Sequence, residues 1–137
     1  MTIVQISGEA LDVAAHEATA AHPGAGATVT FLGVVRDHDH SRHVVALEYE
    51  AHPSAQAVLD EVAAKFRAQP DVLGLAISHR VGALAIGDPA LVAVVSSAHR
   101  QEAFAVCADL VDEVKHSLPI WKRQVFADGT DEWVNCP

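Results

Sequence analysis

Aromatic side chains, cysteines and basic residues are all scarce in this chain of 137 residues. Phe, Trp and Tyr together make up 5% of it, there are two cysteines, and nine Lys and Arg stand against eighteen Asp and Glu. The formal net charge of −9 argues against a general binder of nucleic acid or of anionic membranes, because both need a broad basic surface. It leaves room for a small local cationic pocket.

Other absences narrow the class of protein. Cys107 and Cys136 are far apart and lack a metal or redox spacing, which is typical of reduced thiols in the cytosol. The first residues show no basic segment followed by a long apolar stretch, so no signal peptide is indicated. The longest apolar runs, such as "ALVAVV", are too short to cross a bilayer. We therefore expect a cytoplasmic protein, and without repeats or linkers a single domain over residues 1–137.

Alternating and helical patterns predict an α+β fold, a mostly antiparallel sheet with packed helices. Strands are predicted at 2–7, 27–36, 44–50, 75–84 and 90–97, and helices within 9–22, at 54–69 with Ser54 as N-cap, and at about 100–118. We expect the strands at 27–36 and 44–50 to pair as antiparallel neighbours across a polar turn. Short extended segments and a turn at 128–129 complete the chain.

One lysine falls where an apolar side chain is expected. At 100° per residue, Phe104, Ala108, Val111 and Leu118 share a narrow sector of the last helix, and Lys115 falls inside that sector. One interpretation is that the lysine stem lies on apolar surface while its ammonium reaches water. The other is that Lys115 projects into a cleft, where loss of water would make it chemically useful.

Further cations lie at the ends of predicted elements. Pro119 ends the helix and directs the chain so that Lys122 returns near Lys115, although a Trp-Lys-Arg run is also typical of a solvated strand edge. Arg36 closes a strand, and His99-Arg100 begin the last helix, whose free N–H groups either bind an anion or are capped by Ser97 and Glu102. Together they predict an anion-binding pocket formed by Arg36, His99, Arg100, Lys115 and Lys122.

Several other motifs in the sequence do not indicate a functional site. The tract "DHDHSRH" (37–43) lacks partners at metal-ligand spacing and is interpreted as a solvated loop. No P-loop, GxGxxG or GxSxG pattern is present. His79 is interpreted as a satisfied core histidine, and Arg80, on the other face of its strand, as a possible interface cation.

The segments "FLGVVRDH", "LEYEAH", "ISHRVGALAIGD", "VVSSAHRQEAF", "VKHSLPIWKRQ" and "EWV" carry a family resemblance. In this order they resemble the large, catalytic subunits of molybdopterin synthase, the MoaE family. The resemblance implies an α/β-hammerhead fold and a homodimer with a small ubiquitin-like sulfur carrier at each outer end, a heterotetramer. The carrier's C-terminal Gly-Gly thiocarboxylate would donate sulfur to cyclic pyranopterin monophosphate, giving the dithiolene of molybdopterin without a metal or organic cofactor.

The resemblance also assigns roles to residues. Lys115 and Lys122 match the catalytic lysines, Lys115 as acid/base or transient acyl acceptor and Lys122 at the leaving oxygen. The substrate-binding residues that it implies are Val34, Val35, Arg36, His99, Arg100, Lys115, Lys122, Arg123 and Gln124.

Two departures from the family pattern leave an alternative open. Relatives commonly have Glu where this chain has Gln124, and they often continue past "WV" with a tail that bears an Arg, whereas this sequence reads "NCP". The alternative is a carrier-binding module with little turnover. The cations alone also fit a third possibility, an anion-binding protein unrelated to this family.

Overall fold

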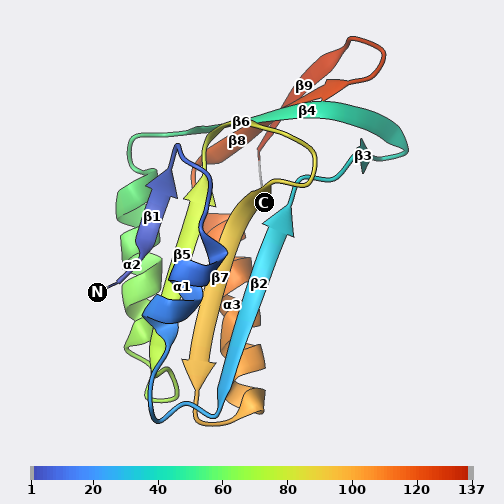
Figure 1. Ribbon diagram of the computed structural model, residues 1–137. Coiled ribbons are helices and arrows are strands. Elements are labelled where there is room, and N and C mark those ends of the chain that lie inside the picture. The colour runs from blue at the N-terminus through green and yellow to red at the C-terminus, as the bar shows by residue number, and fades with distance from the viewer. Residues whose placement is uncertain (1, 136–137) are drawn as a thin grey trace.

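The computed structural model describes residues 2–135 and has two sheets (Figure 1). The first sheet has the order β1-β5-β7-β2, formed by β1 (Val4–Ser7), β5 (Gly74–Arg80), β7 (Pro89–Ser97) and β2 (Ala27–Val34). The β1–β5 pair is parallel and the other two pairs are antiparallel. β7 is buried along nearly its whole length, as its continuous apolar run predicts. β2 forms one edge of this sheet.

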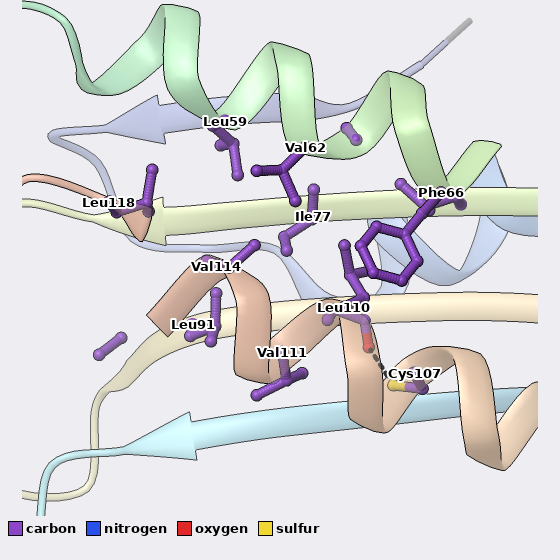
Figure 2. Close-up of a cluster of buried hydrophobic side chains, with 14 of the residues drawn as sticks. Leu59, Val62, Phe66, Ile77, Leu91, Cys107, Leu110, Val111, Val114 and Leu118 are labelled. Carbon is purple, nitrogen blue, oxygen red and sulfur yellow. Dashed lines mark hydrogen bonds between the residues drawn. The ribbon is translucent and has the colours of Figure 1, made fainter. Parts of the chain in front are cut away.

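Three helices cover the first sheet. Helix α1 (Val13–Ala20) packs on β5 and β7, while α2 (Ala55–Arg67) and α3 (Arg100–Ser117) pack on each other and on the opposite face, as Figure 1 shows. The main core lies between this face and these two helices. Its labelled side chains in Figure 2 include Leu59, Phe66, Ile77, Leu91 and Leu110, all nearly or fully buried. Burying each such side chain stabilises the fold by about 1.5–3 kcal/mol.

The second sheet lies across one end of the first (Figure 1). It has the order β3-β4-β8-β9, and β6 also pairs with β4. Its strands are β3 (His38–Asp39), β4 (Arg42–Ala51), β6 (Gly82–Leu84), β8 (Ile120–Phe126) and β9 (Asp131–Asn135). The chain passes from β5 into β6 through Gly82, which has φ +93°, a conformation that side-chain-bearing residues rarely adopt. This turn carries the chain from one sheet to the other.

The α+β class and the mostly antiparallel pairing are confirmed, but one predicted pair is wrong. β2 pairs with β7, and β4 pairs with β8, so the strands expected at 27–36 and 44–50 lie in different sheets. The segment 37–43 is also more ordered than a turn, because β3 forms a hairpin with the start of β4 through His40 and Ser41, both at positive φ. The strand expected at 75–84 is divided into β5 and β6. Local alternation identifies a strand and its faces but not its partner.

Two of the four residues in the apolar stripe predicted for the last helix, Val111 and Leu118, are buried, and the other two are exposed. Phe104 is 62% exposed and Ala108 is exposed, whereas the buried residues are Ala103, Val106, Cys107, Leu110, Val111 and Val114. The helix carries two adjacent apolar stripes, and the one that ends at Val114 faces the core. Lys115 therefore lies at the border of the core and is partly buried.

Ser54 occupies the N-cap position of α2 but makes no capping hydrogen bond, and its hydroxyl lies 2.8 Å from Nδ1 of His52. The thiol of Cys136 lies outside the described residues, while Cys107 is buried and free. Across residues 2–135, no helix is long and apolar enough to span a membrane.

Candidate anion-binding site

The register of the second sheet sets one wall of the candidate site. Tyr49 on β4 lies directly opposite Lys122 on β8, and Leu47 lies opposite Gln124. Directly opposed residues of antiparallel strands point to the same face, so these four side chains share the face turned toward the first sheet and its helices. Leu47 and Tyr49 are buried, Gln124 is 3% exposed, and Lys122 is partly buried.

Three elements meet at this wall and enclose a recess of about 200 Å³. The segment after β2 contributes Arg36, the last turn of α3 contributes Lys115, and β8 contributes Lys122. The residues that line the recess are Val34, Val35, Arg36, His38, Leu47, Tyr49, Lys115, Lys122 and Gln124. None of these described lining residues is an Asp or Glu, so the recess presents positive charge in a protein whose net charge is −9. Such a recess favours an anionic ligand.

A hydrogen-bonded chain orients the cationic rim of the recess. Nε2 of Gln124 donates to Oδ2 of Asp39 at 2.9 Å and to Oε1 of Glu132 at 3.2 Å. The other oxygen of Asp39 lies 3.6 Å from Nη2 of Arg36. The hydrogen bond from Gln124, followed by the nearby His40, Lys122 and Arg36, lowers the pKa of Asp39. Gln124 therefore holds the carboxylate against which Arg36 rests.

The backbone N–H and carbonyl of Val35, just after β2, are both hydrogen-bonded. The N–H of Val35 donates to the carbonyl of Asp88 at 3.1 Å, and its carbonyl accepts from the N–H of Gly87 at 2.8 Å. These bonds tie the segment that carries Arg36 to the loop before β7. Val34, 49% exposed, follows a bulge in the β2–β7 pairing. The two valines thus fix the position of Arg36.

The structure brings six of the nine predicted site residues to the recess and leaves three elsewhere. Arg123 points to the opposite face of β8, where its Nε donates to Asp131 at 2.7 Å. His99 and Arg100 begin α3, and Lys115 is in its last turn. Fifteen residues of helix separate Arg100 from Lys115, a distance of about 22 Å. His99 lines a separate small cavity with Asp71 and Glu102.

Sequence reasoning missed three residues that line the recess, namely His38, Leu47 and Tyr49. His38 belongs to the tract interpreted as a solvated loop, and its Nδ1 lies 2.8 Å from the carboxylate of Asp37. Leu47 and Tyr49 lie on one face of the strand predicted at 44–50, and only the register with β8 shows that this face also carries Lys122. Among residues 2–135, no cluster of three or more His, Cys, Asp or Glu has the geometry of a metal site.

A second, apolar groove runs between the open edge of β2 and α3. It has a volume of about 330 Å³ and is lined by Val29, Thr30, Phe31, Phe104, Cys107, Ala108, Val111 and Asp112. Phe31 is 36% exposed and Phe104 is 62% exposed. The groove contains Phe104 and Ala108, the two exposed residues of the predicted apolar stripe, beside Val111, which is buried.

The fold and the recess define a class: α+β proteins in which two lysines and an arginine from three elements face a cavity suited to an anion. The chain belongs to the MoaE protein family, whose profile matches residues 6–117. It is 40% identical over 112 residues to the molybdopterin synthase catalytic subunit of Nostoc sp., a match that covers 80% of this chain and 68% of that protein.

Solved structures agree with the family assignment. The crystal structure of molybdopterin synthase from Staphylococcus aureus superposes with a TM-score of 0.86 at 28% sequence identity, over 96% of both chains. A complex of subunits 1 and 2 of molybdopterin-converting factor from Helicobacter pylori gives a TM-score of 0.73 at 22% identity, over 97% of this chain and 88% of that one. Because the sequence identity to the Helicobacter pylori complex is 22%, this similarity supports the fold assignment alone.

Proposed function

We propose that this chain is the catalytic subunit of a molybdopterin synthase, a sulfurtransferase. It would transfer sulfur from the C-terminal thiocarboxylate of a small ubiquitin-like carrier to cyclic pyranopterin monophosphate. The observation that carries this proposal is the recess in which Arg36, Lys115 and Lys122 converge without a lining carboxylate. Membership of the MoaE family and the name of the Nostoc relative support it. A cytoplasmic location remains part of the proposal.

The proposed chemistry needs the charges that the recess supplies. The donor is an anionic thiocarboxylate, the acceptor carries a cyclic phosphate, and negative charge moves when the phosphate ring opens. Fixed cations in a partly dry cavity stabilise such charges better than the same groups in water. Arg36 would bind the phosphate, because a guanidinium matches two phosphate oxygens. Lys115 would act as acid/base or transient acyl acceptor, and Lys122 would stabilise or protonate the leaving oxygen.

His99, Arg100 and the apolar groove fit the same proposal if two copies associate. β2 runs from the His99 end of α3 to the Lys115 end, since Ala27 pairs with Ser97 and Val34 with Pro89. A two-fold axis through the groove would reverse the second copy, so that its His99 and Arg100 would approach the recess of the first. A homodimer of this kind would place all five predicted cations around one substrate, with a carrier bound at each outer end.

Formation of molybdopterin from purified carrier thiocarboxylate and precursor tests the proposal. Lys115→Ala is expected to lower the turnover rate by about 100-fold or more, the range for loss of a general acid–base group, while carrier binding persists. Lys65→Ala is a matched control, because Lys65 is an exposed lysine paired with Glu113 on α3. Normal turnover by Lys115→Ala would contradict the catalytic assignment. A wild-type chain that binds carrier but makes no molybdopterin would favour a carrier-binding module.

A further inference from the structure

His79 is a buried titratable residue that the proposed mechanism does not use. It lies near the end of β5, is 3% exposed, and is flanked in register by Ile6 on β1 and Leu91 on β7. Its Nδ1 is 2.8 Å from the backbone carbonyl of Arg80. A carbonyl only accepts hydrogen bonds, so Nδ1 carries the hydrogen and the neutral ring has its lone pair on Nε2.

The ring of His79 contacts the wall of the recess. Its centroid is 4.9 Å from that of Tyr49, with the ring planes at 83°, an edge-to-face arrangement. Tyr49 lines the recess and lies directly opposite Lys122, whereas His79 does not line it. His79 therefore supports a residue that contacts the site from a position behind the lining.

The charged neighbours of His79 are few. Lys115 is within electrostatic reach from α3, and the phenol of Tyr49 approaches from β4. On its own strand, the adjacent Arg80 has its Nη1 3.3 Å from Oδ2 of Asp88. The neighbours in register on β1 and β7 are apolar. Burial, opposed by the hydrogen bond to Arg80 and reinforced by Lys115, lowers the pKa of His79 to about 4, so the ring is uncharged at neutral pH.

We propose that His79 is a positioning residue of the recess, a buried imidazole that fixes the ring of Tyr49 beside Lys115 and Lys122. This proposal rests on the proposed sulfur-transfer function. A protonated imidazole would place a second buried positive charge near Lys115, and the repulsion would displace the lysine from its reactive orientation. Loss of the ring would leave Tyr49 without its edge contact.

A matched pair of histidine variants separates this role from simple packing. His16 is also 3% exposed and contacts β5, but its Nε2 lies 2.7 Å from the hydroxyl of Ser78, whose side chain points to the other face of the strand. His79→Asn keeps a donor for the Arg80 carbonyl and is expected to lower kcat about tenfold or more, because small misplacements of reacting groups are costly. Its KM values should stay within about twofold, since binding contacts remain. His16→Asn is expected to leave kcat unchanged. Equal kcat values for His79→Asn and wild type would overturn the proposal.

A titration of the imidazole protons by NMR tests the link to Lys115 without turnover. Replacing the lysine in Lys115→Gln is expected to raise the pKa of His79, because Lys115 lowers it in the wild type. An unchanged His79 titration would overturn the proposal even if His79→Asn were too unstable to assay. A wild-type chain that makes no molybdopterin would instead count against the proposed function, and the NMR result would still decide whether His79 and Lys115 are coupled.

Discussion

At the scale of single residues, the two carboxylates beside Gln124 explain why this position carries an amide. The resemblance to MoaE proteins leads one to expect Glu at this position, and the sequence alone suggested that its absence weakens the site. In the structure the buried amide donates to both Asp39 and Glu132. A third carboxylate here would face two others with no donor between them. In this chain, glutamine is therefore the residue that satisfies its surroundings.

Gln124→Glu is expected to destabilise the fold by about 2 kcal/mol at pH 7, because two partly buried hydrogen bonds are replaced by repulsion between carboxylates. The wild-type amide lowers the pKa of Asp39, so its contribution is present above the ordinary aspartate pKa and is lost as pH falls through the lowered value. The Gln124→Glu variant lacks this contribution, and repulsion from the two neighbouring carboxylates raises the pKa of the carboxyl group that it introduces. Between pH 7 and pH 4 the wild-type contribution persists while the variant carboxyl becomes protonated, so the difference in stability from wild type should shrink over this range.

Urea unfolding at both pH values measures this difference, and Gln5→Glu is the control, since Gln5 is an exposed strand glutamine. The control is expected to change stability by less than about 0.5 kcal/mol. A Gln124→Glu protein as stable as wild type at pH 7 would show that the hydrogen bonds of the Gln124 amide do not stabilise the fold.

At the scale of elements, sequence patterns located most helices and strands but not their partners. The continuous apolar run was sufficient to identify β7, and the helical spacing of apolar residues was sufficient to identify α2. Burial on two faces or on one face imposes these patterns. The pairing of β2 with β7, and the two adjacent stripes of α3, depend on contacts between distant segments, which no local period encodes. The division of β5 from β6 depends on one backbone angle at Gly82.

Gly82→Ala tests how much that angle contributes to stability. A Cβ at Gly82 would meet no atom within 4 Å, so the expected loss of about 1–2 kcal/mol comes from the positive φ alone. Gly8 is a matched control, because its added Cβ is equally uncrowded and its φ is not in the positive range. Gly8→Ala should be neutral or stabilising by up to about 1 kcal/mol. Thermal unfolding of both variants compares them, and equal melting temperatures would exclude backbone strain at Gly82.

At the scale of the whole molecule, the recess combines residues that the sequence separates widely. Arg36, Lys115 and Lys122 were grouped because each cation lies at the end of a predicted element, and the family resemblance added their roles. No spacing in the chain links the end of β2 to the end of α3. Proximity of Lys122 to Lys115 was also suggested by the turn at Pro119. The helix predicted at about 100–118 already separates Arg100 from Lys115 by about 22 Å, so the predicted grouping of these two cations in one pocket of a single chain conflicted with the predicted helix itself.

If a second copy supplies Arg100, mixing two impaired variants should restore part of the wild-type activity. Arg100→Ala is expected to lose roughly tenfold or more in turnover, since a hydrogen bond to a charged group contributes about 1.5–3 kcal/mol. Mixed dimers of Lys115→Ala and Arg100→Ala would contain one intact site and one doubly altered site. Random reassortment of a two-fold dimer would then give roughly one quarter of wild-type turnover.

The matched control for this complementation joins Lys115→Ala with Lys122→Ala. Both lysines line the same recess within one chain, so no mixed dimer of these two variants has an intact site. Isotope labelling of one variant in each pair, needed because the Lys115→Ala and Lys122→Ala chains have the same mass, lets native mass measurement show that mixed dimers form in each sample. Restored turnover in the Arg100 mixture and none in the Lys122 mixture would establish a site shared between copies. No restoration in either mixture would place Arg100 outside the reaction of the neighbouring recess.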